Sequence, residues 1–184
     1  HGLPSILKSQ ENVMPYTSRH LINTLAHGKP LPKGEPEDLL FHALEMLHPM
    51  DVEQATSIGA NARRTDRQGR PAFHVLLDAW DRRPGHPERL LSCAMTLYRM
   101  GVDFRALHPQ SKISVAERSL VLLQHPAIAR RWFHAVEHRL EWGIVSSTGQ
   151  PLWQAAAERA DGAVKVLLEQ RFSLAGPSSR RFRP

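Results

Sequence analysis

The strongest constraint on the fold is a pattern of short apolar segments with helical spacing, each bounded by proline, glycine or a capping residue. The order of proline or cap, apolar helix, turn, second apolar helix and stop occurs four times along the chain. Sustained alternation of apolar and polar residues, which would indicate strands, is nearly absent. The sequence therefore predicts an all-α protein with helices at about 17–27, 36–47, 51–58, 71–80, 87–100, 114–124, 126–142, 151–159 and 161–170.

Several helix boundaries carry residues with a known physical preference. Pro36 fits the first position of a helix, where its missing N–H costs no hydrogen bond. Asp51 with Gln54, and Ser114 with Glu117, have the spacing of a capping box, in which the first side chain accepts a hydrogen bond from the backbone. We therefore expect helices to open at Asp51 and at Ser114.

The helix pairs recur with a nearly regular period. Their predicted starts lie 35 to 43 residues apart, and Gly59, Gly101 and Gly143, each expected to stop a second helix, lie 42 residues apart. Such a period made of two helices indicates an α-solenoid, because stacking buries the apolar faces that one pair leaves exposed. We expect a short α-solenoid of about four stacked helix-turn-helix repeats at 35–175. An N-terminal arm, helix and connector at 1–34 precede it, and a flexible basic tail at 176–184 follows.

Two stretches resemble a known family. Residues 66–77 (Asp-Arg-Gln-Gly-Arg-Pro-Ala-Phe-His-Val-Leu-Leu) resemble the opening of an ankyrin repeat, an Asp-x-x-Gly turn followed by Thr-Pro-Leu-His. Residues 100–106 (Met-Gly-Val-Asp-Phe-Arg-Ala) resemble its closing phrase, Gly-Ala-Asp-Val-Asn-Ala. Residues 147–170 repeat the opening as Gly-Gln-Pro-Leu-Trp and add the helix Val-Lys-Val-Leu-Leu. The chain is thus similar to the ankyrin-repeat family, most clearly at 66–106 and 147–170.

The resemblance implies a stack of repeats whose turns project as fingers and whose exposed side chains bind another macromolecule. By resemblance, His74 would link one finger to the next through hydrogen bonds. The chain departs from the family pattern at three positions. Pro71 replaces the threonine of the opening, Trp153 stands where histidine is usual, and Arg171 falls where a capping glycine is expected.

Composition narrows the classes of function. The formal net charge is +6, and the 24 basic residues comprise 19 arginines and 5 lysines. Arginine recognises carboxylates and phosphates through a planar, bidentate fork. The single cysteine, Cys93, excludes an internal disulfide. No apolar run is long enough to span a membrane, and no secretory signal is visible, so a cytoplasmic location is expected, or delivery into another cell if the protein is a bacterial effector.

Arginines cluster around the first predicted finger. We expect these arginines and two nearby residues, Trp80 and Arg105, to contact a protein partner that has an acidic surface. The expected contact residues are Arg63, Arg64, Arg67, Arg70, Trp80 and Arg105. A solvated loop is the simpler interpretation of the arginine cluster. Binding to nucleic-acid phosphates is the alternative function. A non-catalytic scaffold with no cofactor is the favoured prediction.

One motif points to catalysis instead. His134, Glu137 and His138 match the His-x-x-Glu-His arrangement of inverted zinc peptidases, with Glu158 or Glu169 as candidates for a further ligand. The same segment carries apolar residues at the spacing of a buried helix face, which favours structural or surface histidines. A zinc-dependent hydrolase is therefore the second alternative function, and no metal site is the prediction.

Overall fold

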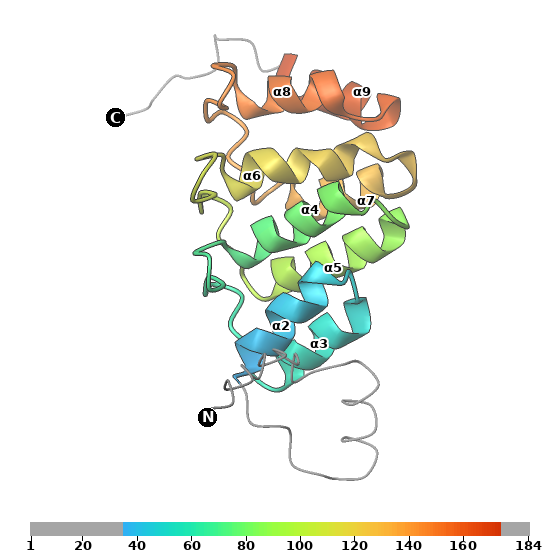
Figure 1. Cartoon of the computed structure of the whole chain (residues 1–184). Coiled ribbons are helices and arrows are strands. Elements are labelled where there is room, and N and C mark those ends of the chain that lie inside the picture. The colour runs from blue at the N-terminus through green and yellow to red at the C-terminus, as the bar shows by residue number, and fades with distance from the viewer. Residues whose placement is uncertain (1–34, 174–184) are drawn as a thin grey trace, which may run out of the picture. The chain divides into compact units, whose positions relative to one another are not determined.

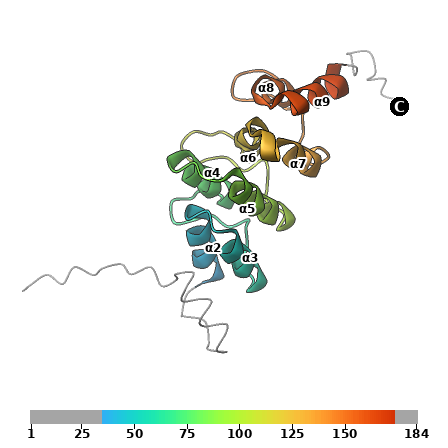
Figure 2. The same cartoon turned by 90° about the vertical axis from the view of Figure 1, so that its right-hand side faces the viewer.

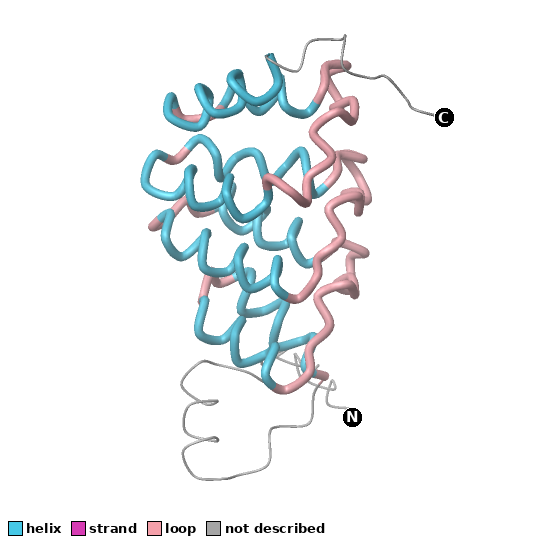
Figure 3. Tube along the Cα trace, turned by 180° about the vertical axis from the view of Figure 1, so that it is seen from behind, coloured by secondary structure: helices cyan, strands magenta, loops and turns pink. Residues whose placement is uncertain are grey.

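The computed structural model describes residues 35–173, and these form helices and connecting loops with no strand among them (Figures 1 and 3). The all-α prediction is confirmed for this part of the chain. The α-helices are α2 Pro36–Glu45, α3 Pro49–Ser57, α4 Ala72–Arg82, α5 Pro87–Arg99, α6 Val115–Arg118, α7 Pro126–Val136, α8 Leu152–Arg159 and α9 Gly162–Ser173; a 3₁₀ helix, η1 Ser119–Gln124, directly follows α6. The predicted helix 17–27, the arm and connector within 1–34 and the tail 176–184 lie outside the described residues.

The described helices form four successive pairs: α2 with α3, α4 with α5, the α6–η1 segment with α7, and α8 with α9. The first helix of each pair packs on the first helix of the next, through α2 on α4, α4 on α6 and η1 on α8. The second helices pack likewise, through α3 on α5, α5 on α7 and α7 on α9. The pairs therefore follow one another as two layers of helices (Figure 2).

Aromatic side chains fill the space between the second and third pairs. Phe73 of α4 and Trp132 of α7 are fully buried, and their ring centres lie 5.7 Å apart. Tyr98 and Phe104 complete this cluster, with their ring centres 6.4 and 6.5 Å from that of Trp132. Each such ring removes a large apolar area from water, so this cluster is a main source of cohesion between neighbouring pairs.

The connections between pairs all lie along one edge of the helices (Figure 3). We call them finger 1 (residues 61–71), finger 2 (103–114) and finger 3 (141–151). Each is closed by one antiparallel bridge: Thr65 with Pro71, Leu107 with Ser114, and Val145 with Pro151. The bridges define equivalent positions in the three fingers without reference to sequence similarity.

The helix starts follow the proline and capping signals, with one difference. Ser114 is an N-cap whose hydroxyl oxygen accepts a hydrogen bond from the Glu117 N–H at 3.2 Å, as predicted. The expected cap at Asp51 is wrong, because α3 already begins at Pro49 and Asp51 lies inside its first turn. Proline at the first helical position sets the backbone angle and needs no hydrogen-bond partner, so Pro49 opens α3 two residues before Asp51.

The glycine spacing predicts the first two pairs correctly and the third wrongly. Gly59 and Gly101 adopt left-handed backbone angles, with φ of 97° and 77°, and end their helices as expected. Both lie six residues before the bridge residue of their finger, and in finger 3 that position is Arg139. Helix α7 ends at Val136 without a left-handed residue, and Gly143 lies within finger 3. The identical 42-residue glycine spacing is therefore not the spacing of equivalent positions.

Candidate basic cavity at the bases of the fingers

Two of the six predicted contact residues are buried. The Arg70 side chain is 10% exposed and lies 2.7 Å from an Asp66 carboxylate oxygen and 3.1 Å from those of Asp78 and Glu45. Burial by itself lowers the pKa of Arg70, but the hydrogen bonds and charges of these carboxylates outweigh it and raise the pKa. Arg70 thus ties α2, finger 1 and α4 together. Trp80 is 5% exposed and packs edge-on against His125. The expectation that these residues meet a partner is corrected: both serve packing within the fold.

Two further predicted residues are exposed but already paired. Arg64 lies 3.2 Å from a carboxylate oxygen of Glu35 and 3.7 Å from one of Glu37, and Arg67 lies 3.7 Å from one of Asp38. Exposed pairs of this kind contribute little to stability, but they reduce the positive potential that finger 1 presents. The first finger is therefore less basic than its sequence indicates.

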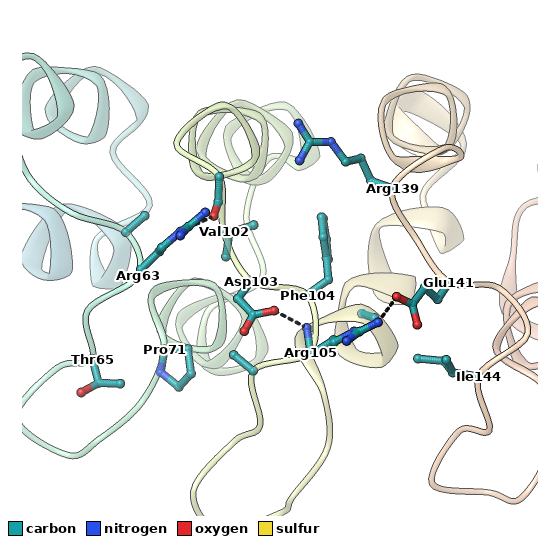
Figure 4. Close-up of a pocket in the computed structure, with 14 residues that line it drawn as sticks. Arg63, Thr65, Pro71, Val102, Asp103, Phe104, Arg105, Arg139, Glu141 and Ile144 are labelled. Carbon is teal, nitrogen blue, oxygen red and sulfur yellow. Dashed lines mark hydrogen bonds and ion pairs between the residues drawn. The ribbon is translucent and has the colours of Figure 1, made fainter.

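The remaining two, Arg63 and Arg105, line a cavity of about 470 Å³ at the bases of the fingers (Figure 4). They occupy equivalent positions, two residues before the bridge residues Thr65 and Leu107. Each reaches toward the next repeat. The Arg63 Nε donates a hydrogen bond to the Gly101 carbonyl at 3.2 Å, and Arg105 forms an ion pair with Glu141. The hydrogen bond from Arg105 to Glu141 and the charge of that carboxylate raise the pKa of Arg105.

The third arginine of the cavity, Arg139, was not predicted. Its guanidinium lies over the Tyr98 ring, 5.4 Å from the ring centre, and makes no ion pair with the described residues. Arg139 stands where Gly101 stands one repeat earlier, and its side chain lines the same cavity as Arg63 and Arg105 (Figure 4). The glycine spacing places Gly143 at this equivalent position and so misses Arg139, because the bridges that define the equivalence are visible only in the structure.

The electrostatics of the cavity favour an anion. Three guanidinium groups and the carboxylates of Asp103 and Glu141 line the cavity, which leaves one net positive charge among the lining side chains. Asp103 also accepts a hydrogen bond from the Arg105 backbone N–H at 2.9 Å, so its carboxylate serves the turn. The half-buried ring of Phe104 forms part of the wall. The cavity thus combines an apolar wall with an arginine that has no carboxylate partner among the described residues.

The hydrogen bond expected of His74 is present, whereas the expected correspondence of Trp153 to the family histidine is off by one residue. His74 is fully buried, and its Nε2 lies 3.3 Å from the Ala106 carbonyl of finger 2. Burial lowers the pKa of His74 to about 4, so the ring is neutral at pH 7. The bridges make Pro71 equivalent to Pro151, so Phe73, not His74, corresponds to Trp153.

The proposed zinc ligands do not form a metal site with other described residues. Helix α7 ends at Val136, so His134 and His138 do not lie on successive turns of one helix. Their ring nitrogens lie 3.6 and 3.5 Å from a Glu137 carboxylate oxygen, while Arg171 lies 2.6 Å from the other oxygen of Glu137. Within 35–173 no group of three or more His, Cys, Asp or Glu residues is placed to hold a metal ion. Glu158 pairs with Gln150 and Glu169 with Lys165.

Cys93 offers no reactive thiol. It is fully buried in α5, and burial raises its pKa to about 12. A cysteine acts as a nucleophile through its thiolate, which this environment strongly disfavours. Cys93 thus occupies the position of a small buried apolar residue.

Comparison with known proteins gives no family assignment: no protein-family model matches the chain, and no curated protein matches it. None of the helices within 35–173 combines the length and the apolar character needed to cross a bilayer. The function must therefore be argued from the geometry above.

Proposed function

We propose that this protein is a non-catalytic interaction scaffold, a short α-solenoid of four ankyrin-like repeats that binds an acidic segment of a protein partner at the basic cavity. The observation that carries the proposal is Arg139, a guanidinium held over Tyr98 with no ion pair among the described residues. Two further arginines, Arg63 and Arg105, line the same cavity from the preceding fingers.

The chemistry of the site suits a carboxylate. Arginine presents parallel N–H donors that match a carboxylate bidentately, and the Tyr98 ring reduces the freedom that Arg139 would lose on binding. Binding is also favoured because the helices on either side of the cavity pack in two layers, so the surface is already ordered before the partner binds. Ordering in advance lowers the entropic cost of association.

Nucleic-acid binding is the weaker alternative. A nucleic-acid surface needs several unpaired cations along a backbone, whereas Arg64, Arg67 and Arg70 are all paired with carboxylates. A single cavity with one net positive charge fits an isolated carboxylate better than a row of phosphates. The two functions also differ in their expected dependence on salt, because phosphate contacts release counterions.

The test is a titration with two labelled probes, an acidic hexapeptide of glutamates and aspartates and a 20-base-pair DNA duplex, followed by fluorescence anisotropy. We expect Arg139→Gln and Arg63→Gln each to weaken binding of the acidic peptide about tenfold, equivalent to about 1.4 kcal/mol. Arg130→Gln is the matched control, because Arg130 of α7 is exposed like Arg139 but does not line the cavity. Equal losses in all three variants, or tighter binding to DNA than to the peptide with a steep salt dependence, would contradict the proposal.

A further inference from the structure

A second cavity arises from a difference between equivalent positions in the repeats. In the second and fourth pairs, the residue before the N-cap of the first helix contacts a residue seven positions after that cap. In the second pair these are Arg70 and Asp78, whose side chains lie 3.1 Å apart. In the fourth pair they are Gln150 and Glu158, joined by a hydrogen bond of 3.0 Å. The third pair has no polar side chain at either of these two positions.

In the third pair the two positions hold Ile113 and Val121. Both are half-buried, and both line a cavity of about 290 Å³ together with Leu77 of α4. This apolar surface therefore lies between two neighbouring repeats that place ionic or hydrogen-bonded side chains at the same position. An aliphatic side chain that entered the cavity would remove this surface from water, which is favourable in proportion to the area buried.

The charged side chains around this cavity are satisfied with one exception. Arg118 is paired with Asp78 and Asp81, and Glu117 accepts hydrogen bonds from the backbone N–H of Ser147, at 2.9 Å, and from its hydroxyl. Arg159 of α8 also lines the cavity, is exposed, and makes no ion pair with the described residues. The lining charges of Asp81, Glu117, Arg118 and Arg159 sum to zero, and Arg159 is the one among them whose charged group has neither a hydrogen bond nor an ion pair with the described residues.

We propose that this cavity binds an extended peptide segment in which an aliphatic residue is followed by an acidic one. The aliphatic side chain would lie against Leu77, Ile113 and Val121, and the carboxylate would pair with Arg159. The inference rests on the proposed function in that the ligand is a protein segment. The two cavities share no lining residue, so their tests are independent.

The experiment uses the protein with ¹³C-labelled isoleucine, leucine and valine methyl groups and three dipeptide probes: N-acetyl-leucyl-aspartate amide, its asparagine isostere, and N-acetyl-alanyl-aspartate amide. We expect saturable shifts of the Ile113 and Val121 methyl resonances with the first probe. The asparagine isostere should bind about three- to fivefold more weakly, the effect of losing one exposed ion pair. The alanyl probe should bind more weakly still, because it lacks the aliphatic side chain.

Two variants separate the two contacts. Arg159→Gln should remove the preference for the aspartate probe over its isostere while leaving the preference for leucine over alanine. Ile113→Gln introduces the residue that the fourth pair carries at the same position, so it should keep the fold and abolish the shift of Val121. Arg139→Gln, in the other cavity, should change neither preference. Shifts centred on finger 1 or on the first cavity, or an aspartate preference that survives Arg159→Gln, would overturn the inference.

Discussion

The second and third helix pairs are equivalent in topology and differ in how they are stabilised. The second pair ends on a left-handed glycine, Gly101, and its first helix carries Asp78, which pairs with arginines from two elements. The third pair has Arg139 at the glycine position and a 3₁₀ segment, η1, in place of a continuous first helix. The second pair thus has the regular repeat features, and the third departs from them.

Both candidate binding sites lie at these departures. Arg139 enters the first cavity because no glycine occupies its position, and Ile113 with Val121 makes the second cavity apolar because the usual polar pair is missing. Side chains at the regular positions make ion pairs and packing contacts with neighbouring repeats, and these contacts hold the helix pairs together. Irregular positions leave side chains available for a ligand. The comparison predicts that substitutions in the second pair affect stability and substitutions in the third affect binding.

The largest expected effect on stability is at Asp78. Its carboxylate pairs with Arg70 and Arg118 and lies 3.6 Å from His108, so it connects finger 1, α4, finger 2 and α6. Asp78→Asn should lower the free energy of unfolding by about 2 kcal/mol, less than for a wholly buried pair because the side chain is 21% exposed. Urea denaturation followed by circular dichroism measures the change.

Asp81→Asn is the matched control for Asp78→Asn. Asp81 pairs with the same arginine, Arg118, but its side chain is 59% exposed, so the expected loss is about 0.5 kcal/mol or less. Equal losses in the two variants would mean that the position of Asp78 between repeats contributes nothing beyond an ordinary surface ion pair.

The next effect is a dependence of stability on pH that originates at His74. In the unfolded chain its pKa is near 6.5, and burial lowers it to about 4 in the folded protein. Between these values the unfolded state binds a proton that the folded state does not, so the contribution of His74 is complete above pH 6.5 and is lost as the pH falls toward 4. We expect the free energy of unfolding to fall by about 1–2 kcal/mol over this range.

His74→Gln should flatten this part of the profile, measured as the urea midpoint at a series of pH values. His134→Gln is the control, because the His134 side chain is 51% exposed whereas His74 is fully buried. This pH range lies above the range in which protonation of Asp78 would change the free energy of unfolding. Burial opposes the ionised form of Asp78, but the hydrogen bond and charge of Arg118, with Arg70 and His108, lower its pKa below 3.8. A His74→Gln profile as steep as that of the unaltered protein would assign the pH dependence to other groups.

The sequence predicts the regular parts of this fold better than the irregular ones. Pro87 opening α5, the Ser114 cap and the Gly101 stop act within a few residues, so local pattern is sufficient to place them. The burial of Trp80 and Arg70 depends on neighbouring repeats, which no local window contains. Of the predicted contact residues, Arg63 and Arg105 line the cavity, and Arg139 was missed because the glycine spacing gave the wrong register for the third repeat.

The smallest expected effect tests whether the third pair can be made more like the second. Gly69 and Gly149 lie two residues before the closing bridge residue in fingers 1 and 3, and both are left-handed, with φ of 74° and 83°. Finger 2 has Lys112 at the equivalent position with φ of 57°, a conformation that costs a residue with a Cβ about 1 kcal/mol. Lys112→Gly should therefore stabilise the protein by about 0.5–1 kcal/mol, partly offset by the greater freedom of glycine in the unfolded chain.

Thermal denaturation of Lys112→Gly beside Lys112→Ala separates the backbone effect from loss of the charge, because alanine removes the ammonium group and keeps the strain. If both variants gain equally, the lysine charge and not the backbone angle distinguishes finger 2 from its neighbours.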